Sequence, residues 1–279
     1  MDVVTRVRRL AVLLTCAQSA FAFARLTPET AAAFDRYVQA AESQMSQDLD
    51  ASRFLHLDSQ PDLKAKLRAG QFIIESGVGL KGRISRDMPD GLLQDWLGRM
   101  FIPGASIEQV KSALQNYANY KSVYQPEVID SKELSHQQDS RGDQYDIFLR
   151  LYEKHVLTVV LNAKYHVDYG RLDAHRMFVN SHSTRIAEAK ESEGLSNLEA
   201  PVGDDSGFLW RLNSYWRFEE ADGGVYAECE AISLSRDVPM GLGFLLKGFI
   251  ERFPKESMEN TLRGTRSAVL SRVSREWTR

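Results

Sequence analysis

Residues 207–237 read GFLWRLNSYWRFEEADGGVYAECEAISLSRD, and this stretch decides the fold. The step Asp222-Gly223 separates two runs in which apolar and polar residues alternate. Asp-Gly between such runs is among the strongest short-range signals of a two-residue β-hairpin, because both positions of a type I′ turn need positive φ. We therefore expect antiparallel strands at Gly207–Glu219 and Val225–Ser235.

The position of the turn predicts which residues oppose each other across the hairpin. On one face, apolar and small residues pair: Phe218 with Ala227, Trp216 with Cys229, Ser214 with Ala231 and Leu212 with Ser233. On the other face, polar residues pair: Arg217 with Glu228 and Tyr215 with Glu230. A slip of one residue would set Trp216 against Glu228, so cross-strand pairing and side-chain alternation agree on this register. The apolar face then needs a cover.

A long amphipathic helix after the hairpin can supply that cover. Residues that recur at helical spacing form one stripe along it: Met258, Leu262, Thr265, Val269 and Val273. The segment before this stripe, residues 239–253, reads PMGLGFLLKGFIERF and is apolar on all sides. It is either a buried helix or a lid at the mouth of a cavity.

The composition is that of a globular protein with a sizeable core. The chain has 279 residues, of which 43% are hydrophobic, and a formal net charge of −3, with Lys and Arg dispersed among acidic residues. Because no basic stripe is present in the sequence, we expect no nucleic-acid partner.

The first 24 residues have the three parts of a secretory signal peptide: a basic segment at 6–9, an apolar run at 10–23 and small residues at 20–24. The apolar run is shorter than the roughly 20 residues that span a bilayer. We therefore expect cleavage near residues 22–24, a periplasmic or secreted protein, and no integral membrane span after signal removal. Cys229 is then the one cysteine left, interpreted as a small buried hydrophobe; a reactive or intermolecular thiol is the alternative.

The rest of the chain predicts a helical extension followed by a mixed region. Residues 25–68 form the extension. Its first helix starts at Thr27-Pro28 and buries Phe34, Val38 and Ala41 on one face. A short helix around Leu63–Leu67 follows. The remaining expected elements are a strand at Gln71–Glu75, helices at Asp90–Phe101 and Ala105–Tyr117, with Ser106 and Gln109 as a capping box, and strands at Val128–Gln137, Gln144–Tyr152, Val156–Tyr169 and Leu172–Ala189.

This order of elements, together with the aromatic run Asn116–Tyr120 that leads to Tyr124-Gln125-Pro126, resembles the START-like superfamily (SRPBCC, polyketide cyclase-like, helix-grip), in particular its secreted bacterial members. The resemblance covers residues 69–279. It implies an α+β fold in which a curved antiparallel sheet of about seven strands wraps around a long C-terminal helix and leaves a cavity between them. Residues 25–68 fall outside the family pattern.

What the resemblance implies about function is binding of an apolar ligand. We expect a periplasmic or secreted binding or carrier protein that holds a lipid or another hydrophobic small molecule in the cavity. A cyclase- or aromatase-like enzyme using the same cavity is one alternative. A protein-interaction module whose cavity is filled by its own side chains is another.

The registers that follow from the expected turn positions predict which side chains point into the cavity. A turn at Gly170-Arg171 would pair Tyr165 with Arg176, and a turn at Glu153-Lys154 would place Arg150 opposite Leu157. A buried guanidinium must be paired or must meet a ligand's carboxylate or phosphate. We therefore predict that Arg150, Tyr165 and Arg176 form a polar end of the cavity. Its apolar wall is predicted to contain Trp210, Leu212 and Trp216. The alternative places both arginines at strand ends, paired with acids such as Glu188 or Glu230.

The opposite face of the same predicted hairpin would bring His166 across from His175 and Asp168 across from Asp173. These groups could bind a divalent metal, but a solvated outer surface explains them as well, and we expect no metal. The sequence has no Gly-x-Ser-x-Gly motif, no P-loop and no dinucleotide fingerprint. We therefore expect no cofactor, and catalytic residues stay unassigned.

Overall fold

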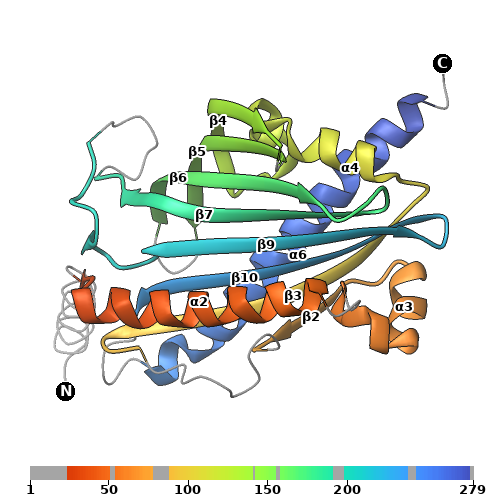
Figure 1. Cartoon of the computed structure of the whole chain (residues 1–279). Helices are drawn as coiled ribbons and strands as arrows, with labels where there is room; N and C mark the ends of the chain where they lie inside the picture. Colours follow the sequence, from red (N-terminus) through yellow and green to blue (C-terminus); the bar gives the residue numbers. More distant parts are fainter. Residues whose placement is uncertain are drawn as a thin grey trace, which may run out of the picture.

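One antiparallel sheet lies between two long helices, one on each of its faces (Figure 1). The structure is a computed structural model that describes residues 24–50, 54–77, 88–140, 142–154, 158–190, 198–237 and 243–276. The predicted signal peptide lies outside the described residues except for Ala24, and so does the start of the segment 239–253.

The sheet has eight strands in the order β2-β3-β10-β9-β7-β6-β5-β4. Their bounds are β2 Ile73–Ser76, β3 Gly91–Pro103, β4 Val128–Asp139, β5 Gly142–Lys154, β6 Thr158–Arg171, β7 Arg176–Glu188, β9 Arg211–Ala221 and β10 Gly224–Arg236. Two short strands, β1 Ala24–Arg25 and β8 Asp204–Asp205, pair with each other. The helices are α2 Pro28–Asp50, η1 His56–Ser59, α3 Pro61–Arg68, α4 Ile107–Leu114, η2 Tyr117–Asn119, α5 Tyr120–Val123 and α6 Gly243–Glu276.

The hairpin predicted at Asp222-Gly223 is confirmed. β9 and β10 are joined at Asp222 and Gly223, whose φ angles of 53° and 76° are both positive. Each predicted cross-strand pair is present, from Phe218 with Ala227 to Leu212 with Ser233, and so are the two polar pairs on the other face. A two-residue turn leaves one possible register, and this is why the prediction succeeded here.

The C-terminal helix α6 covers the face of the sheet that carries Trp216, which we call the inner face. The predicted stripe is buried against it: Met258 and Leu262 share one apolar core with Trp216 and Phe218, and Thr265 and Val269 are buried farther along. The predicted cover of the hairpin is therefore confirmed.

The helix α2 covers the opposite, outer face, as Figure 1 shows in front of β3 and β10. It begins as predicted, with the Thr30 N–H donating to Thr27 Oγ1 over 3.1 Å. Its apolar residues pack on the outer-face side chains in one cluster: Ala33, Phe34, Tyr37, Val38 and Ala41 with Leu93, Trp210, Tyr215, Ile232 and Leu234. Helices therefore cover part of each face of the sheet, and on the outer face the covered part is that of β3, β9 and β10.

Charged groups also attach the extension to the outer face. Arg217 donates to the carbonyl oxygens of Met45 and Phe54, both over 2.9 Å. The buried Glu228 accepts the backbone N–H groups of His56 and Leu57 over 2.9 and 3.1 Å. The polar face predicted from the hairpin thus binds the backbone of Met45, Phe54, His56 and Leu57.

The expected helix at Asp90–Phe101 is wrong, because residues 91–103 form strand β3. This strand lies inside the sheet, between β2 and β10, and both of its faces are covered. Leu93 and Leu97 point outward toward the extension, whereas Leu92 and Trp96 point toward the inner face. Apolar residues on both faces remove the alternation that marks a half-exposed strand, and their spacing imitates a helix.

The expected turn at Gly170-Arg171 is also wrong. The chain turns through residues 172–175, where Asp173 Oδ1 accepts the backbone N–H groups of His175 and Arg176, both over 2.9 Å. Gly170 consequently opposes Phe178, and Tyr165 opposes Ser183 instead of Arg176. A bulge between Lys164 and Tyr165 shifts the register once more.

The neighbouring β5–β6 pairing also differs from its prediction. Arg150 opposes Asn162, and Glu153 opposes Val159, so the chain turns after Lys154 and not at Glu153-Lys154. The longer connection shifts the register of the whole strand pair.

Candidate ligand cavity

A cavity of about 420 Å³ lies between the inner face of the sheet and α6. Its walls come from the inner-face side chains of β3, β5, β6, β7, β9 and β10, from the turn region 114–128 and from α6. The apolar part of the wall consists mainly of Leu92, Trp96, Ile147, Leu149, Leu151, Leu161, Val167, Val179, Leu212, Trp216, Ala231 and Met258. A cavity of this volume and lining suits a hydrophobic small molecule.

The two ends of the cavity differ in exposure. At one end the lining residues are half-buried or exposed: Glu127, Glu153, Phe208, Leu209, Arg236, Asp237 and Phe253. At the other end Leu114, Tyr117 and Tyr169 are buried. We call these the open end and the closed end.

Tyrosines line the closed end. The hydroxyl groups of Tyr117 and Tyr169 share a hydrogen bond of 2.7 Å, and Tyr120 donates to the carbonyl oxygen of Leu114 over 2.5 Å. The Tyr124 hydroxyl meets Thr265 Oγ1 of α6 over 3.0 Å. Burial raises the pKa of each of these phenols, to about 12 for Tyr124, so they are neutral hydrogen-bonding groups at physiological pH.

Tyr165 differs from these tyrosines. It lies on β6, lines the cavity and is 5% exposed, yet no side chain or backbone group in the described part of the chain hydrogen-bonds to its hydroxyl. Burial raises its pKa. Because Tyr165 lines the cavity, its hydroxyl is a point at which a bound molecule can form a hydrogen bond.

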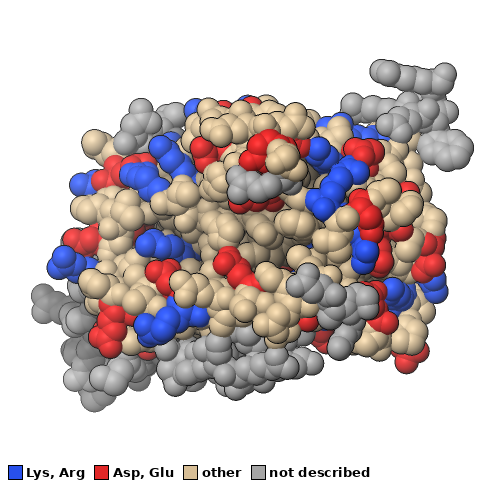
Figure 2. All heavy atoms as spheres, in the orientation of Figure 1, with Lys and Arg blue, Asp and Glu red and all other residues tan. Residues whose placement is uncertain are grey.

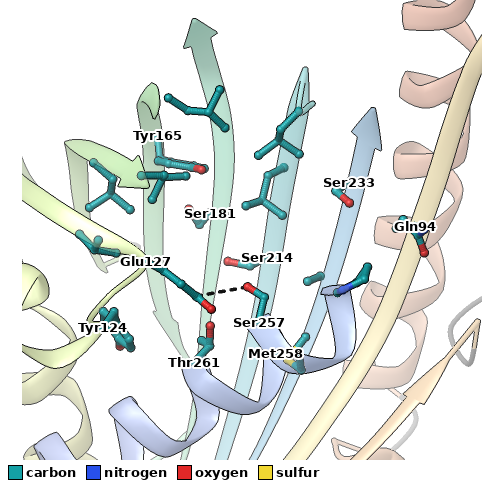
Figure 3. Close-up of a pocket in the computed structure, with 18 of the residues that line it drawn as sticks. Gln94, Tyr124, Glu127, Tyr165, Ser181, Ser214, Ser233, Ser257, Met258 and Thr261 are labelled. Carbon is teal, nitrogen blue, oxygen red and sulfur yellow. Dashed lines mark hydrogen bonds between the residues drawn. The ribbon is translucent and has the colours of Figure 1, made fainter. Parts of the chain in front are cut away.

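Hydroxyl groups also lie on the sheet floor of the cavity. Ser181 of β7 and Ser214 of β9 oppose each other across the two strands, and Ser233 of β10 lies farther along (Figure 3). Each hydroxyl can donate and accept. The floor therefore offers polar contacts within a largely apolar wall.

Three carboxyl groups of the described lining lie at the open end, those of Glu127, Glu153 and Asp237. Glu127 Oε2 accepts from Ser257 Oγ over 3.3 Å, shown as a dashed line in Figure 3, and its Oε1 accepts from Asn260 Nδ2 over 3.0 Å. Burial, and secondly the repulsion by Glu127, raise the pKa of Glu153 to about 8. Glu153 is therefore largely protonated at pH 7, in a position where it lines the cavity.

One basic side chain in the described lining accompanies these acids. Arg236, at the end of β10, donates to the carbonyl oxygen of Ser206 over 3.3 Å, and burial lowers its pKa. Its neighbour Asp237 also lines the cavity.

The structure brings together three of the six residues predicted for the cavity. Tyr165, Leu212 and Trp216 lie on its wall. Their contact with a ligand stays a prediction.

Arg150 and Arg176 do not line the cavity, so the predicted arginine end is wrong. Arg176 forms an ion pair with Asp173, with Nη2 and Oδ2 2.7 Å apart, and lies over the ring of Phe54 on the outer face. Arg150 alternates with the cavity residues Leu149 and Leu151 along β5 and therefore points to the other face. Both errors follow from the misplaced turns.

Trp210 is also absent from the cavity wall. It lies before the first residue of β9, where alternation no longer holds, and its Nε1 donates to Asp205 Oδ1 over 3.2 Å. It is buried beneath α2 with the outer-face cluster.

The sequence reasoning missed the carboxyl groups of the open end. Glu153 shares the inner-face parity of Ile147, Leu149 and Leu151, so a strand extended to residue 154 would have identified it. Glu127 lies in the connection before β4, and no periodicity could have placed it.

The proposed histidine site has a different arrangement from the one expected. His166 opposes His182, not His175, and Asp168 opposes Asn180. His166 Nδ1 lies 2.8 Å from Asp146 Oδ1. No group of three or more potential metal ligands occurs among the residues that the structure describes.

An antiparallel sheet with strand order 2-3-10-9-7-6-5-4, closed on its inner face by a long C-terminal helix, defines the architecture. This is the helix-grip arrangement that the sequence resemblance implied. The cavity lies in the place that this fold provides, between the gripping sheet and the gripped helix.

Solved structures of similar fold include three with lipid-transfer or cyclase descriptions. A STAR-related lipid transfer protein from Xanthomonas axonopodis has 14% identity and a TM-score of 0.43, with 66% of this chain and 96% of that chain covered. Human STARD10 has 9% identity and a TM-score of 0.42, with coverage of 79% and 81%. The Zhui aromatase/cyclase from Streptomyces sp. R1128 has 11% identity and a TM-score of 0.43, with coverage of 65% and 96%.

These likenesses concern the fold alone. No protein-family model matches the chain, and a search of curated proteins finds no match.

Proposed function

We propose that the protein binds or carries a hydrophobic small molecule or lipid in the cavity between the sheet and α6. The observation that supports this most directly is the void of about 420 Å³ with its largely apolar wall. Burial of hydrocarbon there would contribute about 2.5 kcal/mol for each 100 Å² removed from water. Polar groups at Tyr165, on the sheet floor and at the open end would orient the ligand.

The proposed location is the periplasm or the extracellular space. It rests on the signal-peptide pattern in residues 1–24. Among the described residues, none of the helices has the length and apolar character that crossing a membrane requires. On the face that Figure 2 shows, acidic and basic side chains are intermixed. The proposal therefore includes no nucleic-acid partner.

A second candidate is a cyclase- or aromatase-like enzyme, and Glu153 is the observation that favours it. A carboxyl group with a pKa of about 8 inside an apolar cavity has the protonation equilibrium that acid–base catalysis at neutral pH requires. The third alternative, a cavity filled by the protein's own side chains, does not fit the observed void.

Fluorescence titration with N-phenyl-1-naphthylamine, a neutral apolar probe, tests the proposal. The wild-type chain should bind it with saturation, and Ala231→Phe, which adds a ring to the cavity wall, should weaken binding about tenfold or more. Leu134→Phe is the matched control, because Leu134 is 49% exposed on β4, away from the cavity. Equal binding by both variants would locate the probe elsewhere and contradict the proposal.

A further inference from the structure

We propose that the cavity selects hydrophobic ligands whose polar end is a hydrogen-bond donor, above all an ammonium group, and that it disfavours carboxylates. This inference rests on the proposed function and names the ligand class of that same cavity. It reverses the anion-binding end that the sequence predicted, because acids outnumber bases among the described side chains at the open end.

The charges of the cavity lining favour a ligand with a positively charged end. Within the described lining, the carboxyl groups are those of Glu127, Glu153 and Asp237, and the one basic side chain is that of Arg236. Arg236 lies at the end of β10, whereas Glu153 lies on β5, and three strands separate them in the sheet order. The part of the open end near β5 is therefore acidic. An ammonium or hydroxyl group placed there can donate to the Glu127 carboxylate, and an ammonium also favours ionisation of Glu153, but a ligand carboxylate would meet the like charge of Glu127.

Hydrogen bonds from α6 hold the Glu127 carboxylate in place. Ser257 and Asn260 of α6 fix both of its oxygens, so this carboxylate is held in place where the helix meets the loop before β4. Each carboxylate oxygen can accept more than one hydrogen bond. A ligand donor that reaches this carboxylate would therefore meet an acceptor whose position α6 fixes.

Tyr165 supplies an independent observation that points to a ligand in the same cavity. The residue is buried and lines the void, and its hydroxyl has no hydrogen-bond partner in the described part of the chain. Tyr165 lies six residues along β6 from Val159, the partner of Glu153, which corresponds to about 20 Å of strand. The cavity therefore has polar contacts both at its acidic end and well inside the apolar wall.

Calorimetric titration with three ten-carbon probes tests the inference: decylamine, 1-decanol and decanoate at pH 7. The expected dissociation constant for decylamine is at least about tenfold lower than for decanoate, with 1-decanol between them. In the double variant Glu127→Gln, Glu153→Gln, the amine and the carboxylate should bind within about threefold of each other. Each single variant should lose part of the discrimination, so the test does not depend on the folding of the double variant.

A matched control removes the same charge outside the cavity. Glu256 of α6 has a half-exposed side chain and is not part of the lining. Glu256→Gln should keep the full discrimination between decylamine and decanoate.

Proton release gives a readout that a purely structural role would not move. Because Glu153 is largely protonated at pH 7, an ammonium that binds it should displace up to about one proton. Buffers of different ionisation enthalpy measure that release, which should be absent with 1-decanol. The affinity for decylamine should also rise from pH 6 to pH 8. Among the residues that the structure describes, the charged neighbours in the lining that could alter this response are Glu127, Arg236 and Asp237, since α6 contributes only Phe253, Pro254, Ser257, Met258 and Thr261 to that lining.

The outcomes separate the two proposals. Decanoate binding as tightly as decylamine, or discrimination that persists in the double variant, would overturn the inference and leave the carrier function standing. Failure of all three probes and of N-phenyl-1-naphthylamine to bind would overturn the carrier function, and the inference with it.

Discussion

At the scale of single residues, Tyr165 and Tyr117 border the same cavity but differ in their hydrogen bonds. Tyr117→Phe breaks the hydrogen bond with Tyr169 and leaves the Tyr169 hydroxyl buried without its partner. We expect it to lower the free energy of unfolding by about 1–3 kcal/mol, whereas Tyr165→Phe should change it by less than about 0.5 kcal/mol. Urea unfolding of both variants measures the difference. Equal losses would mean that the Tyr165 hydroxyl has a partner after all.

The buried acids predict how stability depends on pH. Burial, followed by repulsion from Asp95, raises the pKa of Glu230 to about 8, whereas an unfolded Glu titrates near 4.3. Between these values the folded state binds more protons than the unfolded state, so the contribution of Glu230 to stability is lost as pH rises through this window. Glu153 acts in the same direction.

Urea unfolding from pH 5 to pH 8 measures this effect. The free energy of unfolding should fall with rising pH, by at most about 1.4 kcal/mol per pH unit for each group, and Glu230→Gln should make the slope shallower. Arg263→Gln, a change of an exposed ion pair on α6, is the control and should keep the wild-type slope. An unchanged slope in Glu230→Gln would show that Glu230 is ionised throughout this range.

Single residues also show where sequence reasoning holds. The faces of Leu212 and Trp216 could be predicted because Asp222-Gly223 permits one turn and hence one register. The faces of Arg150 and Arg176 could not, since the turns next to them are longer and a bulge intervenes at Lys164. An error of one residue in a turn moves every following side chain to the other face.

At the scale of elements, α6 packs tightly against the sheet at a glycine. A Cβ atom at Gly98 of β3 would lie 2.7 Å from Met258 Sδ and 2.9 Å from Leu262 Cδ1. Gly98→Ala should therefore force the helix or these side chains to shift, at a cost of about 1–3 kcal/mol in the free energy of unfolding.

A double-mutant cycle tests that contact. Met258→Ala removes the nearest side chain, so the double variant Gly98→Ala, Met258→Ala should be more stable than the sum of the two single losses predicts. Strict additivity would show that α6 does not press on the sheet at Gly98.

The elements were predictable where one face differs from the other. α2 and α6 each have one apolar stripe, and both were expected from their sequences. β3 was not, because it is covered on both faces and lacks alternation. The burial of Glu228 and Arg217 beneath the extension could not be read from the sequence either, since charge alone predicts a solvated face.

At the scale of the whole molecule, the sheet separates two regions with different chemistry. Its outer face binds the extension through apolar packing and buried charges, and its inner face encloses the cavity together with α6. The sequence could predict the gripping arrangement, because the order of the last strands and the helix determines it. It could not predict the acidic open end, which depends on Glu127 in a connecting segment and on the true end of β5.

Native mass spectrometry of the protein, purified without detergent from its own source, tests the central claim that this cavity holds a hydrophobic molecule. The account predicts a bound species of a few hundred daltons that leaves on denaturation, partitions into organic solvent and is lost from Ala231→Phe but kept by Leu134→Phe. A wild-type protein that carries no such species, or one that Ala231→Phe carries equally well, would contradict it.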